Sequence, residues 1–152
     1  MQKVEITINK SDVYEEVAKT SAYIGGKSID ANGNNLYDQV FVTSEDKEML
    51  ERFWNGAIAS LTYVLDSVLI QAIEDEDEGN LTMILGMTNN FKMALKDALL
   101  STSVEYMENK IIGEWCAITD KTETEQYAGQ ASALLLQVSN IIHKRCRPIR
   151  NF

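Results

Sequence analysis

Apolar residues recur most regularly between residues 43 and 74. The steps between them are ones, threes and fours, which is the spacing of one continuous stripe on an α-helix. The stripe consists of Met49, Leu50, Phe53, Trp54, Ala57, Ile58, Leu61, Val64, Leu65, Val68, Leu69, Ala72 and Ile73. No proline interrupts it, and only Gly56 weakens it. We predict a central helix roughly 45 Å long. Neighbouring helices, from this chain or from another subunit, must cover its stripe.

Residues 3–9 follow a different pattern, in which apolar and polar side chains alternate. Val4, Ile6 and Ile8 share one face, and the period of two with β-branched residues predicts a half-buried strand. The best internal partner is the apolar run 81–87, although this run also fits the start of the next helix. Without that partner, we expect the first strand to join the sheet edge of a neighbouring subunit.

A first helix is predicted after this strand. Asp12 and Glu15 have the spacing of a capping box, with Ser11 as an alternative cap, and Gly25 with Gly26 should stop the helix near Ile24. The polar segment 27–42 then forms a long connection. Loops of this length in compact domains are usually functional or mobile, so we expect it to dock a partner.

Two more helices are predicted in the second half of the chain. One begins at Asn89 or Asn90 and runs to about Ile118, and its apolar stripe rotates, which indicates that its neighbours change along its length. The other begins with the capping box of Thr122 and Glu125 and ends before Pro148. We therefore expect a single helical domain, residues 1–152. Its fold is mainly α, an antiparallel bundle of three to four helices with a small N-terminal strand element.

The charge is unevenly distributed over a chain whose formal net charge is −9, which argues against general nucleic-acid binding. The acidic run consists of Glu74, Asp75, Glu76, Asp77 and Glu78. The basic C-terminal residues are Lys144, Arg145, Arg147 and Arg150. Five acids at the C-terminal end of the predicted central helix are repelled by its dipole and by one another. The acidic run is therefore either a solvated linker or a site for a cation or a basic partner.

Catalytic, metal and cofactor sites are not indicated. The only histidine, His143, is a favourable cation near a helix end, and no carboxylate stands at Glu-x-x-His spacing. Cys116 and Cys146 match no metal or redox motif, which fits two thiols in a reducing compartment, with a disulfide as the alternative. We also find neither a signal peptide nor an apolar run long enough to span a membrane.

Two segments of the first third of the chain resemble a known class of proteins. They are residues 16–25 (EVAKTSAYIG) and, after Tyr37 and Asp38, residues 44–54 (SEDKEMLERFW). This stretch is similar to small proteins encoded among the morphogenesis genes of tailed phages and prophages. The resemblance implies a virion structural or assembly component, of the head–tail connector or tail-completion type, that acts in a ring.

These observations together lead to an expected function. We expect a non-enzymatic protein of the host cytoplasm or the virion that binds copies of itself or other virion proteins. The acidic run and the basic C-terminal residues have opposite signs, and head-to-tail contact between subunits would satisfy both. The alternative is a cytoplasmic helical adaptor or regulatory module that binds a partner protein in a bundle groove. An enzyme with acidic metal chemistry is the third hypothesis.

Overall fold

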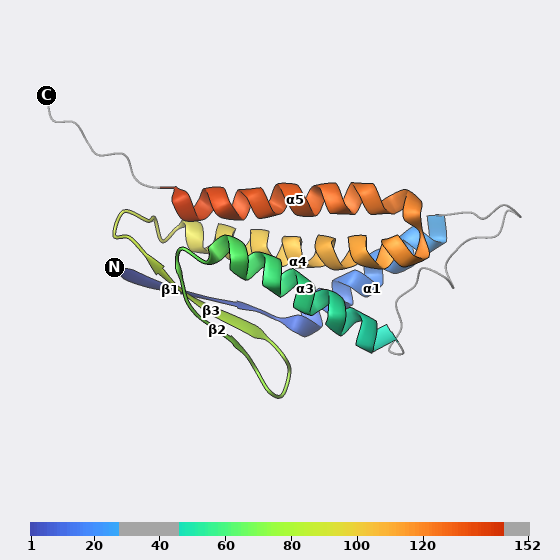
Figure 1. Ribbon diagram of the computed structural model, residues 1–152, viewed down its shortest axis with the longest axis horizontal. Coiled ribbons are helices and arrows are strands. Elements are labelled where there is room, and N and C mark those ends of the chain that lie inside the picture. The colour runs from blue at the N-terminus through green and yellow to red at the C-terminus, as the bar shows by residue number, and fades with distance from the viewer. Residues whose placement is uncertain (28–45, 145–152) are drawn as a thin grey trace, which may run out of the picture.

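The computed structural model describes residues 1–27 and 46–144 (Figure 1). The elements of this part of the chain follow in order. They are β1 (Gln2–Ile8), α1 (Lys10–Lys27), α3 (Lys47–Leu65), β2 (Leu69–Glu74), β3 (Leu81–Met87), α4 (Leu95–Thr119) and α5 (Lys121–His143). The protein is mainly helical with one small antiparallel sheet that includes the N-terminal strand, so the predicted fold class is confirmed.

The sheet has three strands in the order β1-β3-β2. β3 pairs with β1 from Gln2↔Met87 to Ile8↔Leu81, which confirms the predicted pairing of residues 81–87 with the first strand. Alternate residues of both strands point to the helices and are at most 1% exposed. These inward residues are Val4, Ile6, Ile8, Leu81, Met83, Leu85 and Met87. One face of the sheet therefore belongs to the hydrophobic core.

The predicted central helix is wrong in its last third. α3 ends at Leu65, and Leu69 begins an extended strand that pairs with β3. Apolar residues at mixed short steps fit either a helical stripe or a strand with an irregular register, and β2 has such a shift between Leu69 and Gln71. Residues 69–74 form a strand and not a helix because they pair with β3. The start of the predicted helix, residues 43–45, lies outside the described residues.

Four predicted helix boundaries also differ, two of them in α1. Helix α1 continues through Gly25 and Gly26 to Lys27, and its start is capped by Asn9, whose side chain accepts from the Asp12 amide at 3.0 Å. Two glycines cost a helix about 1 kcal/mol each relative to alanine, which packing of the buried Ile24 beside them offsets.

The third and fourth predicted helices start elsewhere for similar reasons. α4 begins at Leu95, because the residues after Thr88 form a turn in which the Phe91 amide donates to the Thr88 carbonyl at 3.0 Å. α5 is capped by Asp120 rather than Thr122, and the Asp120 carboxylate accepts from the Thr122 amide at 3.2 Å. Competing caps within two residues of each other are not separated by sequence alone.

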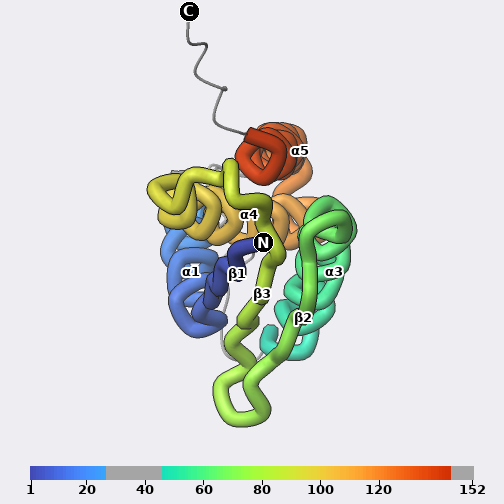
Figure 2. Tube along the Cα trace, turned by 90° about the vertical axis from the view of Figure 1, so that its left-hand side faces the viewer, coloured from blue at the N-terminus to red at the C-terminus, as the bar shows by residue number. Residues whose placement is uncertain are grey.

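Helix α4 is the centre of the molecule. It packs against α1, α3, α5 and β1, which explains the rotation of its apolar stripe. Trp115 of α4, Trp54 of α3 and Cys116 of α4 are buried, whereas Cys146 lies outside the described residues. α5 is the outermost element and rests on α4 (Figures 1 and 2). Among residues 1–27 and 46–144, no helix combines the length and apolar character needed to cross a membrane.

Candidate interaction site

The acidic run lies in the turn between β2 and β3, so its predicted place at the end of a helix is wrong. Glu74 closes β2, and the other four acids follow in the turn. All five side chains are exposed. The hairpin projects from the edge of the molecule that lies opposite α5 (Figures 1 and 2). Helix-dipole repulsion therefore plays no part, and the five carboxylates repel only one another.

The turn is held by its own first aspartate. The Asp75 carboxylate accepts from the amides of Asp77 at 2.7 Å and Glu78 at 3.2 Å, and the Asp75 carbonyl accepts from the Gly79 amide at 2.9 Å. Gly79 has a positive φ of 74°, which a residue with a side chain rarely adopts. Asp75 and Gly79 thus have structural roles, which leaves Glu76, Asp77 and Glu78 presented to solvent.

The hairpin is fastened to the start of α1. The Asn80 side chain accepts from the Lys10 amide at 3.0 Å and donates to the Glu78 carboxylate at 3.2 Å. The Lys10 side chain passes directly beside Gly79, where an added Cβ would come within 2.9 Å of the lysine Cδ. The absence of a side chain at this glycine therefore lets the lysine run beneath the turn.

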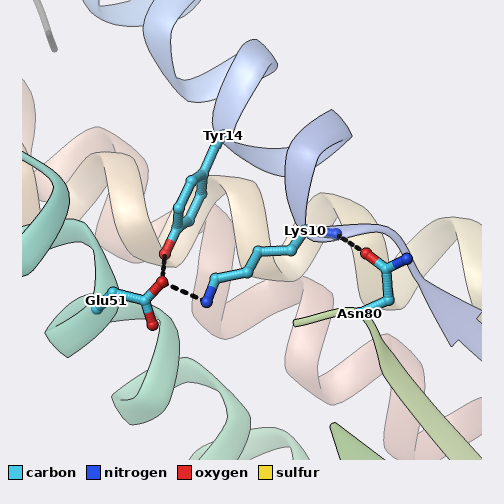
Figure 3. Close-up of polar contacts among 4 residues, drawn as sticks. All are labelled: Lys10, Tyr14, Glu51 and Asn80. Carbon is cyan, nitrogen blue, oxygen red and sulfur yellow. Dashed lines mark hydrogen bonds and ion pairs between the residues drawn. The ribbon is translucent and has the colours of Figure 1, made fainter. Parts of the chain in front are cut away.

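Lys10 continues inward to a polar cluster shared by three elements (Figure 3). Its ammonium group forms an ion pair with Glu51 of α3, and the Tyr14 hydroxyl donates to the same carboxylate at 3.3 Å. The ammonium also lies 5.5 Å from the ring centroids of Tyr14 and Trp54, a distance at which cation–π attraction operates. Because the Lys10 side chain is only 12% exposed, this cluster fixes the hairpin, α1 and α3 relative to one another.

Tyr14 is neutral in this cluster. Burial raises the pKa of its hydroxyl well above the usual range, and the charge of Glu51, the hydrogen bond to Glu51 and the charge of Glu74 add to the shift. Its ring meets the Trp54 ring edge-on, with centroids 6.0 Å apart. The tyrosine therefore serves as a hydrogen-bond donor and packing surface.

A cleft of about 820 Å³ lies between the hairpin, the first turn of α1 and the first turn of α3. Its acidic lining includes all five residues of the acidic run, Asp12 and Glu51. The basic lining is Lys10 and Lys47, and Lys10 is already paired with Glu51. The cleft therefore presents a negative surface suited to a basic segment of a protein partner.

Among the predicted basic contact residues, the structure describes only Lys144, which does not line this cleft. Lys144 is exposed at the end of α5, on the far side of the molecule from the hairpin (Figure 2). Arg145, Arg147 and Arg150 lie outside the described residues. The predicted docking loop, residues 27–42, also lies outside them except for Lys27, the last residue of α1.

No titratable set in the described part of the chain forms a metal centre. Groups of three or more His, Cys, Asp or Glu side chains placed to hold a metal ion are absent from residues 1–27 and 46–144. His143 is exposed at the end of α5. What the structure adds is the cluster of Lys10, Tyr14 and Glu51. These residues are ordinary helix positions in the sequence, so no local signal could have identified them.

Comparison with known proteins yields no relative. No protein-family model matches the chain, no curated protein matches it, and no solved structure matches its fold.

Proposed function

We propose that this protein is a non-enzymatic virion structural or assembly component, of the head–tail connector or tail-completion type, that binds further copies of itself or other virion proteins. The observation that carries the proposal is the separation of charge across the fold. Exposed carboxylates of the hairpin occupy one edge of the molecule, and α5 ends at the opposite edge in the exposed Lys144, the first of the basic C-terminal residues (Figure 2).

This separation favours contact between molecules. Opposite charges on different faces of one chain attract when one copy meets the next head to tail, and such a heterologous contact closes into a ring when the rotation between copies allows it. The similarity of residues 16–25 and 44–54 to small phage morphogenesis proteins supports the same proposal and gives the assembly its context.

The first experiment is the mass of the full chain in solution, measured by sedimentation velocity over a wide range of concentration. We expect assemblies larger than a monomer at about 0.01 M salt, where the Debye length is about 30 Å, and smaller species at about 1 M salt, where it is about 3 Å. A chain that stays monomeric at every concentration and both salt levels overturns the proposal and leaves the adaptor hypothesis.

A matched pair of triple variants then tests the hairpin. Glu76→Gln, Asp77→Asn and Glu78→Gln together remove three charges while keeping Asp75 and Gly79, which form the turn. The control removes three exposed charges elsewhere, through Glu5→Gln, Glu48→Gln and Asp97→Asn. We expect only the hairpin variant to lose the salt-sensitive assembly. Equal behaviour of both variants would mean that net charge, and not the hairpin, controls association.

A further inference from the structure

The outward face of α5 carries no charge over most of its length. Between Glu125 and His143 the helix contains no charged residue, on a chain whose net charge is −9. The exposed side chains of this stretch are small, amide-bearing or apolar, and Leu136 is 63% exposed. Outer faces of surface helices are normally charged and polar, so solvent exposure alone does not explain this composition.

The exposed residues form a regular seam. The α5 seam consists of Glu125, Gly129, Ser132, Leu136, Asn140 and His143, all exposed and spaced by steps of three and four. This is the spacing by which one helix packs lengthwise against another. Nothing lies within 4 Å of a Cβ placed at Gly129, so a second helix can approach the backbone closely there.

The neighbouring part of α3 extends this uncharged surface. Residues 53–65 contain no charged residue, and Tyr63 is 83% exposed. Ala59 and Tyr63 of α3 line a shallow groove together with Leu135 of α5. The surface that a second helix would cover therefore includes an aromatic anchor beside the seam.

The charges at the two ends of α5 indicate what would cover the α5 seam. The helix begins with Asp120, Glu123 and Glu125 around a single Lys121, and it ends in His143 and Lys144. Such ends also suit the dipole of an isolated helix, but the dipole does not explain why residues 126–142 between them carry no charge. Two copies of α5 packed antiparallel would place the acidic end of each against the basic end of the other. Parallel packing would oppose like charges.

We infer that the α5 seam is a two-fold interface between two copies of this chain, with the two α5 helices antiparallel. In this arrangement Leu136 packs on Ser132 of the second copy, and Glu125 lies beside His143 and Lys144 of that copy. The contact is isologous, because each residue pair occurs twice about the two-fold axis. The inference rests on the proposed self-association and assigns it a second surface, distinct from the acidic hairpin.

The decisive measurement is the dimer dissociation constant of the full chain by sedimentation equilibrium at about 1 M salt, where charge contacts are screened to about 3 Å. Leu136→Glu buries two unpaired carboxylates in the seam and should weaken the dimer by about tenfold or more. The control Ile73→Glu introduces the same charge at a residue 47% exposed on β2, at the opposite edge of the molecule, and should leave the constant unchanged. Circular dichroism establishes that both variants fold.

Charge reversal tests the antiparallel orientation at about 0.01 M salt, where the Debye length is about 30 Å. Glu125→Lys and Lys144→Glu should each weaken the dimer, and the double variant should regain most of the loss because the exchanged charges meet again across the two-fold axis. Additive losses in the double variant would overturn the antiparallel pairing.

The outcomes separate this inference from the proposed function. If the wild-type chain associates and Leu136→Glu associates equally well, the α5 interface is wrong and the proposed function stands. If the wild-type chain is monomeric throughout, both are wrong.

Discussion

Helices α4 and α5 are neighbours of nearly equal length that run antiparallel, yet they have opposite roles (Figure 1). α4 is surrounded by α1, α3, α5 and β1, and it buries residues on every side. α5 buries only Ala131, Val138 and Ile142, on one side. The difference shows that length and apolar content do not decide which helix becomes the centre of a fold. The central helix is instead the one that carries large apolar residues on the larger number of its faces.

The largest effect should come from removing matched side chains from the two helices. Ile111 of α4 and Ile142 of α5 are both fully buried. Ile111→Ala should lower the free energy of unfolding by about 3–4 kcal/mol, because neighbours on several sides cannot collapse into the cavity. Ile142→Ala should cost about 2 kcal/mol or less, because it lies in the last turn of an outer helix, where the chain relaxes more easily. Urea denaturation measures both, and equal losses would contradict the distinction between the helices.

A smaller effect is expected from adding a side chain at Gly113, where α4 and α5 lie close together. A Cβ at Gly113 of α4 would lie 3.3 Å from the backbone nitrogen of Ala128 in α5. Gly113→Ala should therefore destabilise the protein by about 1 kcal/mol, since the strain of separating the helices exceeds the gain in helix propensity. Gly56→Ala is the control on α3, where no atom lies within 4 Å, and it should raise the melting temperature instead. Stabilisation by both substitutions would show that α5 moves away from α4 without cost.

An effect of similar size concerns a carboxyl group on α4 and depends on pH. Burial, followed by the charges of Glu16 and Glu105, raises the pKa of Glu108 from 4.5 to about 7. Between these two values the folded protein binds more protons than the unfolded chain, so the free energy of unfolding falls as pH rises and levels off above pH 7. Because Glu108 is partly exposed, solvent screening reduces this contribution to about 1 kcal/mol.

The variant Glu108→Gln isolates this group. It should flatten the decline in stability between pH 5 and pH 7 and make the protein more stable than wild type above that range, as measured by chemical denaturation at several pH values. Glu16→Gln should reduce the slope only in part, because burial remains the larger cause. An unchanged slope in Glu108→Gln would assign the pH dependence to other groups.

The local pattern of the chain was sufficient for several elements. Alternation of Val4, Ile6 and Ile8 identified the first strand, and the run 81–87 identified its partner, because a strand with one buried face has a distinct period. The helical periodicity of residues 47–65 and of the last two helices also predicted their existence, although the caps at Asn9 and Asp120 replaced neighbouring candidates. The charges of the hairpin and of the C-terminal residues were visible as composition.

Tertiary structure alone decided the rest. Residues 69–74 form a strand because β3, which pairs with β1 along one edge, offers its other edge for pairing. This condition depends on residues elsewhere in the chain. The acidic run therefore lies in a hairpin and not at a helix end. Packing against α1, α3, α5 and β1 makes α4, not α3, the centre of the fold. Lys10, Tyr14 and Glu51 meet beneath that hairpin from separate helices. Periodicity is a property of neighbouring residues, whereas burial and charge pairing depend on which distant segments the folded chain brings together.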